Sequence, residues 1–212
     1  MAGIATFEDL CGSWRASAYR AAKKFRFRLS GGYAGVPDVG LLEYRRKEWT
    51  GEFPSVREMS VEERLEELGI QLSAGPSPMA NYVSVQKAGD LWFFSGAGPL
   101  KDGRPTVTGR LGENLTTEQG YQAAREAGIV LLASLKRELA GDWDKLEQIV
   151  KVQGFVSSAN NYYEQPQVIN GVSDLFVEVL GDRGRHARTA LGTNVLPFQL
   201  PLEVEMIVKV KK

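Results

Sequence analysis

Arg188 is the residue whose type and position most strongly suggest binding chemistry. It ends the element Gly184-Arg-His-Ala-Arg188 and begins a largely apolar stretch that is predicted to form a strand. A guanidinium at the start of a strand can point into a cleft and hold a carboxylate through two parallel hydrogen bonds. It can equally form a structural ion pair with Glu203 or Glu205. The pattern of residues leaves both roles open.

The chain contains one cysteine, Cys11, and one histidine, His186. These counts exclude an intramolecular disulfide framework, a cysteine-based zinc cluster, a His-rich metal site and any mechanism that needs two imidazoles. No Ser-His-Asp triad can be argued from spacing. We expect His186 to be a loop residue that makes hydrogen bonds, and its replacement by alanine to be mild.

The sequence does not favour phosphate or nucleic-acid binding. The segment Ser95-Gly-Ala-Gly98 follows a predicted strand, but no helix opens directly after it, as a Rossmann or P-loop phosphate site requires. Arg183 and Arg185 lie close in sequence to acidic residues, which indicates a mixed surface. With 26 basic and 26 acidic residues the net charge is zero, whereas nucleic-acid binders are usually basic.

Residues 59–212 have the patterns of one folded domain. Two capping boxes mark helix starts, with Ser60 and Glu63 for the first and Thr116 and Gln119 for the second. A further helix is expected from about Pro166 to Gly181. The expected helices and strands, in order, are helix 60–69, strands 82–86 and 91–95, a weaker strand 105–110, helix 116–139, strand 147–157, helix 166–180, and strands 188–196 and 202–210.

This order predicts an α+β fold in which both long helices cover one face of a sheet. The last predicted strand carries apolar residues on one face, and Ile207 interrupts the polar residues on the other. The second sheet face therefore needs cover, and we expect other subunits to supply it.

Residues 1–58 differ from the rest and are assigned to a separate N-terminal extension. They hold ten Lys or Arg and seven Asp or Glu, and residues 10–29 have the apolar spacing of an amphipathic helix. A transit peptide, a docking helix and a leader without function are all open interpretations. No apolar run approaches the roughly 20 residues of a membrane span, and no secretory signal is expected.

Residues 59–212 resemble the RidA/YjgF family, also called the L-PSP endoribonuclease or reactive-intermediate deaminase family. Several short stretches match this family in the same order along the chain. The chain is most similar to the branch with a Gly-Arg-His-Ala-Arg element. The matching stretches are Asn81–Val83, Leu91–Gly96, Val150–Val156, Val168–Asn170, Ala187–Ala190, Leu196–Pro197 and Leu202–Glu205.

The resemblance implies a chorismate-mutase-like fold, with an antiparallel-rich mixed sheet, assembled as a homotrimer around a central barrel with ligand clefts between subunits. It implies hydrolysis of reactive enamines and imines, of the 2-iminopropanoate type, to 2-oxo acids and ammonia. No metal or organic cofactor is implied.

The resemblance also implies a set of site residues. Arg188 matches the arginine that binds the substrate carboxylate, and Glu203 matches the acid that orients a water. The positions that match the remaining cleft residues are Tyr82, Ser95, Gly96 and Asn170. Ala190 departs from the pattern, because the best-studied branch has cysteine there, and this departure puts identity of the substrate in doubt.

Three functions therefore compete. The first is an imine deaminase, the second is a non-catalytic trimer that binds a small carboxylate at Arg188, and the third is a ribonuclease or translation inhibitor, which the zero net charge disfavours. The expected partners are a small carboxylate ligand and further copies of the chain, with no membrane and no nucleic acid. The expected compartment is the cytoplasm, or an organelle if residues 1–58 are a transit segment.

Overall fold

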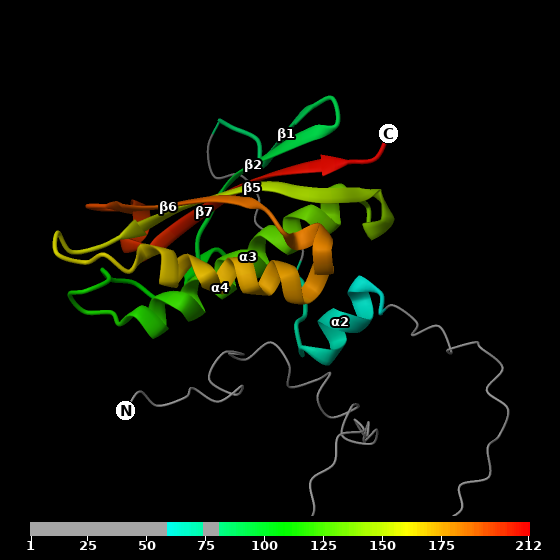
Figure 1. Ribbon diagram of the computed structural model, residues 1–212. Helices are drawn as coiled ribbons and strands as arrows, with labels where there is room; N and C mark the ends of the chain where they lie inside the picture. The colour runs from blue at the N-terminus through cyan, green and yellow to red at the C-terminus, as the bar shows by residue number, and fades with distance from the viewer. Residues whose placement is uncertain (1–58, 74–80) are drawn as a thin grey trace, which may run out of the picture. The chain divides into compact units, whose positions relative to one another are not determined.

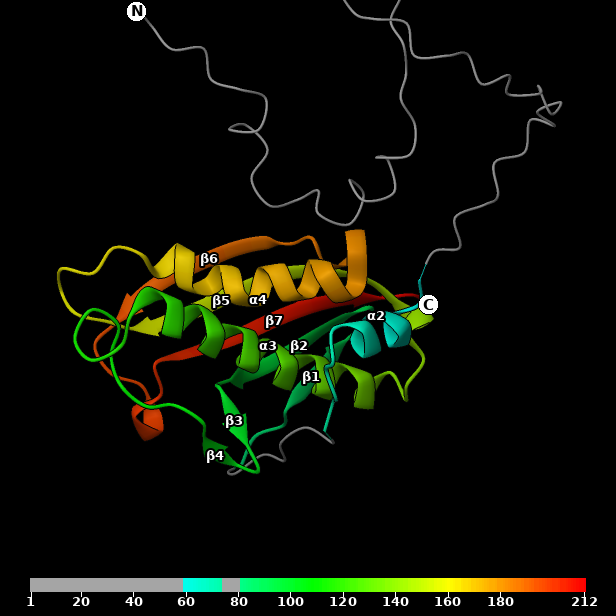
Figure 2. The same ribbon diagram turned by 90° about the horizontal axis from the view of Figure 1, so that it is seen from below.

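The computed structural model describes residues 59–73 and 81–212, and the amphipathic helix expected within residues 1–58 lies outside them. Two long helices pack side by side on one face of a five-stranded sheet, with a short helix beside them (Figures 1 and 2). The α+β fold is therefore confirmed. None of the described helices is long and apolar enough to cross a membrane.

The helices begin and end where the sequence predicts. Helix α2 (Val61–Glu67) and helix α3 (Thr117–Glu138) each start with a complete capping box, at Ser60 and Thr116. Helix α4 (Gln165–Leu180) has Pro166 in its first turn and ends at Gly181, whose φ of 62° favours glycine. Short 3₁₀ turns cover Trp143–Lys145, Gly181–Gly184 and Pro197–Gln199.

The sheet has the order β1-β2-β7-β5-β6, and only the β5–β6 pair is parallel. Its strands are β1 (Val85–Ala88), β2 (Leu91–Ala97), β5 (Leu146–Ser157), β6 (Ala187–Thr193) and β7 (Leu202–Val210). Strand β7 is central and alternates strictly between buried and half-buried residues. Its buried residues, together with the facing sides of α3 and α4, form the hydrophobic core.

Three strand predictions need correction. The expected strand 105–110 is not formed; only Arg104–Pro105 pairs, as β4, with Leu100–Lys101 of β3. Pro105 has no N–H to donate, and Gly109 has a φ of 137°, so the chain cannot continue as a regular strand there. Strand β1 starts at Val85 rather than Tyr82, and β6 ends at Thr193, four residues before Pro197.

The sheet face turned away from the helices carries apolar side chains that the described residues leave uncovered. We call Phe93, Phe155, Leu191 and Ile207 the open face. Phe93 pairs with Ile207 across β2 and β7, and Phe155 pairs with Leu191 across β5 and β6. Phe93 and Leu191 are 41% and 49% exposed. An apolar sheet face of this kind is typical of a surface that packs against another layer.

Candidate functional site

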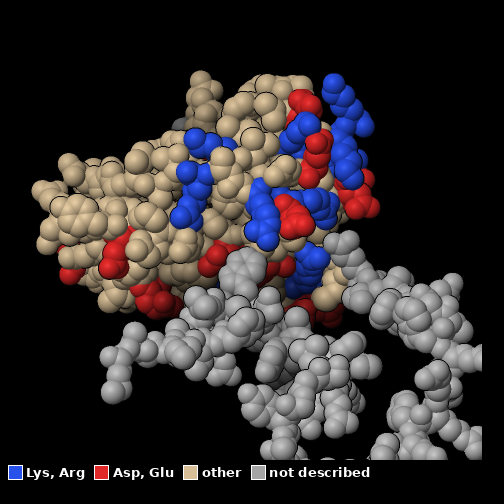
Figure 3. Space-filling model, viewed as in Figure 1, with Lys and Arg blue, Asp and Glu red and all other residues tan. Residues whose placement is uncertain are grey.

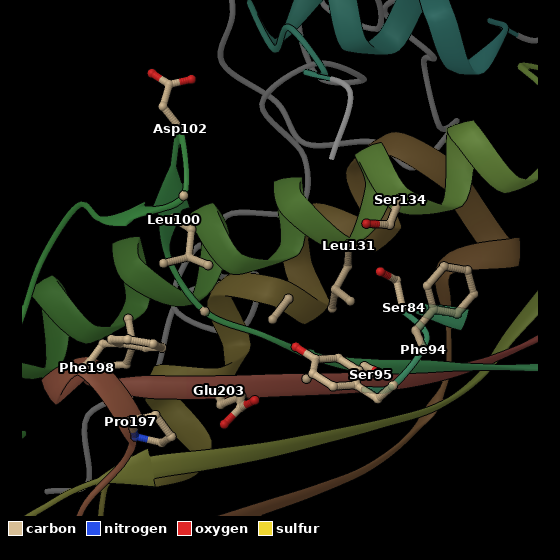
Figure 4. Close-up of a pocket in the computed structure, with 16 residues that line it drawn as sticks. Ser84, Phe94, Ser95, Leu100, Asp102, Leu131, Ser134, Pro197, Phe198 and Glu203 are labelled. Carbon is tan, nitrogen blue, oxygen red and sulfur yellow. The ribbon is translucent and has the colours of Figure 1, made fainter. Parts of the chain in front are cut away.

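A pocket of about 430 Å³ opens where β2 ends and β7 begins. Figure 4 shows Ser95 and Glu203 at its centre, Pro197 and Phe198 toward one end, and Ser84 and Ser134 toward the other. Apolar side chains from β2, β3, α3 and the Pro197–Gln199 turn form much of the wall. The pocket lining includes Tyr82, Ser84, Ser95, Gly96, Phe198 and Glu203.

A β-bulge shapes the centre of this pocket. Phe94 pairs with Met206, and Ala97 pairs with Val204. Between these two pairs β2 advances by three residues and β7 by two, so β2 has one extra residue. The extra residue lies at Ser95 or Gly96. Bulges re-aim side chains and are enriched beside active sites. Gly96 also leaves space for the Glu203 side chain, which lies against its Cα.

Ser95 joins the Tyr82–Ser84 segment to the bulge. Its hydroxyl donates to the Val83 carbonyl at 2.7 Å, and its N–H donates to the Ser84 carbonyl at 2.9 Å. These two bonds hold Tyr82 at the pocket, where the ring is 52% exposed. The Ser95 hydroxyl hydrogen is already committed to Val83, so this hydroxyl can meet a ligand only as a hydrogen-bond acceptor.

Glu203 is the half-buried acid of the pocket. Burial raises the pKa of its carboxyl above the ordinary value, and the nearby Glu205 carboxylate raises that pKa further. Within the described residues no cation pairs with Glu203, and the pocket lining includes no Lys, Arg or His. A carboxylate with a raised pKa is a better proton acceptor and suits general acid–base chemistry.

Phe198 lines the pocket but is not among the site residues predicted from the sequence. Its φ of 56° lies in the left-handed region, as does the φ of 57° of Gln199. Two consecutive non-glycine residues in this region are strained, and such strain is common at ligand sites. The Phe198 ring is 63% exposed although it lines the pocket. The sequence carries no signal for this beyond Pro197.

Arg188, Asn170 and Ala190 form a second group on the edge strand β6 and helix α4. The Arg188 Nη1 donates to Asn170 Oδ1 at 2.8 Å and to Ser173 Oγ at 3.1 Å. The structure gives Arg188 no ion pair among residues 59–73 and 81–212, so the structural pair with Glu203 or Glu205 is not formed within one chain. Ala190 packs against the core.

The predicted site residues therefore fall into two groups that do not meet in one chain. Arg188 pairs through Val152 with Met206, so it shares the helix-covered face of the sheet. Glu203 pairs with Phe155 and lies on the open face. Strand β5 separates their two strands. The pocket has the acid, and the edge of the sheet has the cation.

The fold agrees with a comparison against known protein families. Residues 62–208 match the family described as "YjgF/chorismate mutase-like, putative endoribonuclease". The chain belongs to this YjgF family, which confirms the resemblance noted from the sequence.

Individual relatives support the assignment. The chain is 40% identical over 146 residues to Protein TCP17 of Trypanosoma cruzi, a match that covers 68% of this chain and 91% of that protein. The solved structure of Atu1372 from Agrobacterium tumefaciens is 39% identical, with a TM-score of 0.67 over 71% of this chain and 92% of that one. A "putative endoribonuclease" from Shewanella oneidensis is 28% identical, with a TM-score of 0.68 over 71% and 99% of the two chains.

Proposed function

We propose that this protein hydrolyses reactive 2-imino acids and enamines to 2-oxo acids and ammonia, as a homotrimer whose clefts are shared between subunits. The observation that carries the proposal is the division of the site. Among residues 59–73 and 81–212, the pocket that holds an acid of raised pKa is lined by no cation, while Arg188 presents unpaired donors outside that pocket. Two copies of the chain would bring the halves together.

The open face supports the same assembly. Its apolar side chains require cover, and α3 and α4 lie on the opposite side of the sheet. Packing of open faces against one another in a closed ring removes this apolar surface from water. The edge strand β6 of one subunit would then approach the pocket of the next. In that arrangement Arg188 faces Glu203 of a different chain.

The chemistry follows from these residue types. A protonated 2-imino acid has a carboxylate beside an electrophilic C=N carbon. Arg188 holds the carboxylate and so fixes that carbon next to a water at Glu203. Water attacks the carbon, its proton passes to the Glu203 carboxylate, and the C=N electron pair moves to nitrogen. Glu203 then protonates the nitrogen, and ammonia leaves as the hydroxyl gives its proton back to the Glu203 carboxylate, which yields the 2-oxo acid.

Ribonuclease activity is the other function suggested by the relatives' descriptions, and the chain supports it poorly. Acidic side chains, Asp102 and Glu203, line the pocket, and no basic side chain does so within the described residues. On the face shown in Figure 3, basic and acidic residues are intermixed. RNA binding depends on basic surfaces that track phosphates.

Binding of a carboxylate without turnover is the second candidate, and Ala190 favours it, because the best-studied deaminases of the family have cysteine there. The test is an ammonia-release assay on freshly generated 2-iminopropanoate and its larger homologues, beside a titration with pyruvate. Imines also hydrolyse in water, so the rate must exceed that of buffer and of Arg188→Ala protein. Turnover supports the deaminase; binding alone supports the second candidate; neither overturns both.

A further inference from the structure

We propose that Ser173 and His186 are positioning residues that hold Arg188 ready to bind a carboxylate through one edge of its guanidinium. The proposal rests on the proposed function, in which Arg188 is the carboxylate ligand. Neither Ser173 nor the histidine belongs to the site residues that the family resemblance implies. Their role emerges from a continuous set of hydrogen bonds that joins β6 to α4 and to the preceding 3₁₀ turn.

The first step is the state of one nitrogen of Arg188. A guanidinium has five N–H donors, two of them on Nη1. Asn170 Oδ1 at 2.8 Å and Ser173 Oγ at 3.1 Å accept from Nη1, so both of its hydrogens are used. In the described part of the chain, Nε and Nη2 make no such bond. These two nitrogens carry the parallel N–H pair that binds a carboxylate side-on.

The second step is the tautomer of His186. Its Nδ1 lies 2.6 Å from the Gly184 carbonyl oxygen, which can only accept, so Nδ1 carries the hydrogen. In the neutral ring Nε2 is then bare and acts as an acceptor. It lies 3.0 Å from Ser173 Oγ, so the serine hydroxyl donates to it. The Ser173 oxygen thereby presents its lone pairs to Arg188.

The chain of donors therefore has one direction. Arg188 Nη1–H donates to Ser173, Ser173 O–H donates to His186 Nε2, and His186 Nδ1–H donates to Gly184. Each bond fixes the donor or acceptor role of the next. The edge of the Phe176 ring contacts the imidazole, with centroids 6.0 Å apart, and limits its rotation.

Burial and the neighbouring Arg188 both favour the neutral form of His186. Burial lowers the pKa of the imidazole below its ordinary value, and the Arg188 charge lowers that pKa further, against a raising effect of the Gly184 carbonyl. Protonation would remove the acceptor of the Ser173 hydroxyl and place a second cation beside Arg188. Carboxylate binding should therefore weaken when the imidazole gains a proton.

Other charged groups on the two elements that His186 contacts are engaged elsewhere. On the preceding turn, Arg185 pairs with Asp182 at 3.0 Å, and Arg183 donates to the carbonyls of Trp143 and Leu146. On α4, Asp174 accepts from Tyr121 and Glu178 pairs with Arg125.

The test measures pyruvate affinity by calorimetry with the full-length chain, because pyruvate is a stable product of the proposed reaction. Ser173→Ala should weaken binding about 2- to 10-fold, the range expected for loss of one hydrogen bond. Ser173→Thr retains the hydroxyl and should keep the wild-type affinity for pyruvate. His186→Phe should weaken binding by a similar factor, and His186→Gln, which retains an acceptor, should restore it.

A pH series provides the readout that a structural role would not change. Because the pKa of His186 lies below its ordinary value of 6.5, wild-type affinity should fall only as the pH drops below 6.5, and the His186→Gln protein should lose this fall. Glu203 does not account for such a fall, because its protonation removes a negative charge from the pocket and strengthens carboxylate binding. This pH series also tests the positioning role if the Ser173→Ala protein fails to fold.

The outcomes separate the two proposals. If Arg188→Ala abolishes pyruvate binding while Ser173→Ala and His186→Phe bind as the wild type does, the positioning role is wrong and the proposed function stands. If Arg188→Ala binds pyruvate as well as the wild type, or the wild type neither binds pyruvate nor turns over the imine, the proposed function itself is overturned.

Discussion

The Glu203 carboxylate lies directly against the backbone of Gly96. A Cβ atom added to Gly96 would be 2.1 Å from Glu203 Oε1 and 2.7 Å from its Cδ, both far inside contact distance. The residue is glycine because the acid occupies the space that a side chain would need. The bulge in β2 and the acid of β7 therefore form one unit, although more than a hundred residues separate them in the sequence.

Gly96→Ala should displace the Glu203 carboxylate and reduce turnover of 2-iminopropanoate at least tenfold, with little change in melting temperature. The backbone of Gly96 is not in the left-handed region, so alanine is allowed there, and the Glu203 side chain has to move from its Cγ outward. Steady-state ammonia release and thermal melting measure the two effects.

The Gly96→Ala effect should shrink when it is measured in a Glu203→Ala background, because the group that it displaces is then absent. Full additivity of the two substitutions would show that Gly96 acts independently of Glu203.

Arg188→Ala should reduce pyruvate affinity by about one to two decades, since hydrogen bonds to charged groups are worth roughly 1.5–3 kcal/mol. Arg188→Lys should rescue only part of this, because an ammonium cannot form the two-pronged contact. The side chain makes no ion pair in the described chain, so melting should change little. A large loss of melting temperature in Arg188→Ala would instead favour a structural role.

The sequence predicted the elements of this fold well, since the signals are local. Both capping boxes, at Ser60 and Thr116, lie where expected, and the alternation of β7 is visible in the chain itself. The strand predicted at 105–110 is wrong because apolar alternation was weak there and a proline starts it.

The site was predicted less completely. The family resemblance supplied Arg188 and Glu203, but Ser173 and Phe198 depend on tertiary placement. Ser173 is one of several polar residues on α4, and only the packing of α4 against β6 shows that it touches Arg188. The expectation of a mild effect at His186 rested on its sequence neighbours, which do not reveal that contact.

Glu203→Gln should raise the melting temperature slightly at neutral pH and leave it unchanged at acid pH. Because burial raises the pKa of Glu203, the folded chain binds its proton more readily than the unfolded chain does. Stability from this group is complete below the unfolded pKa and is lost as the pH rises through the raised folded pKa. Glutamine stays neutral and should remove this loss.

Melting curves of the wild type and of Glu203→Gln, recorded from acid to neutral pH, provide the measurement. Glu66→Gln on the exposed side of α2 is the matched control. The control reports what the same substitution does at an exposed position. A Glu203→Gln protein that melts lower than the wild type at neutral pH would mean that a favourable contact of the carboxylate outweighs the cost of its burial.

The open face should hold the proposed trimer together. Phe93→Glu would place a charge among apolar side chains that face another subunit, and a buried unpaired charge is strongly unfavourable. In the single chain Phe93 is 41% exposed, so the substitution should leave the fold intact.

Light scattering at micromolar protein should give a trimer mass for the wild type and a lower mass for Phe93→Glu. Leu68→Glu, at a residue 39% exposed beside α2, should remain trimeric. Loss of imine turnover together with the trimer would tie activity to the shared cleft, whereas a wild-type protein of single-subunit mass would contradict the assembly and the divided site that depends on it.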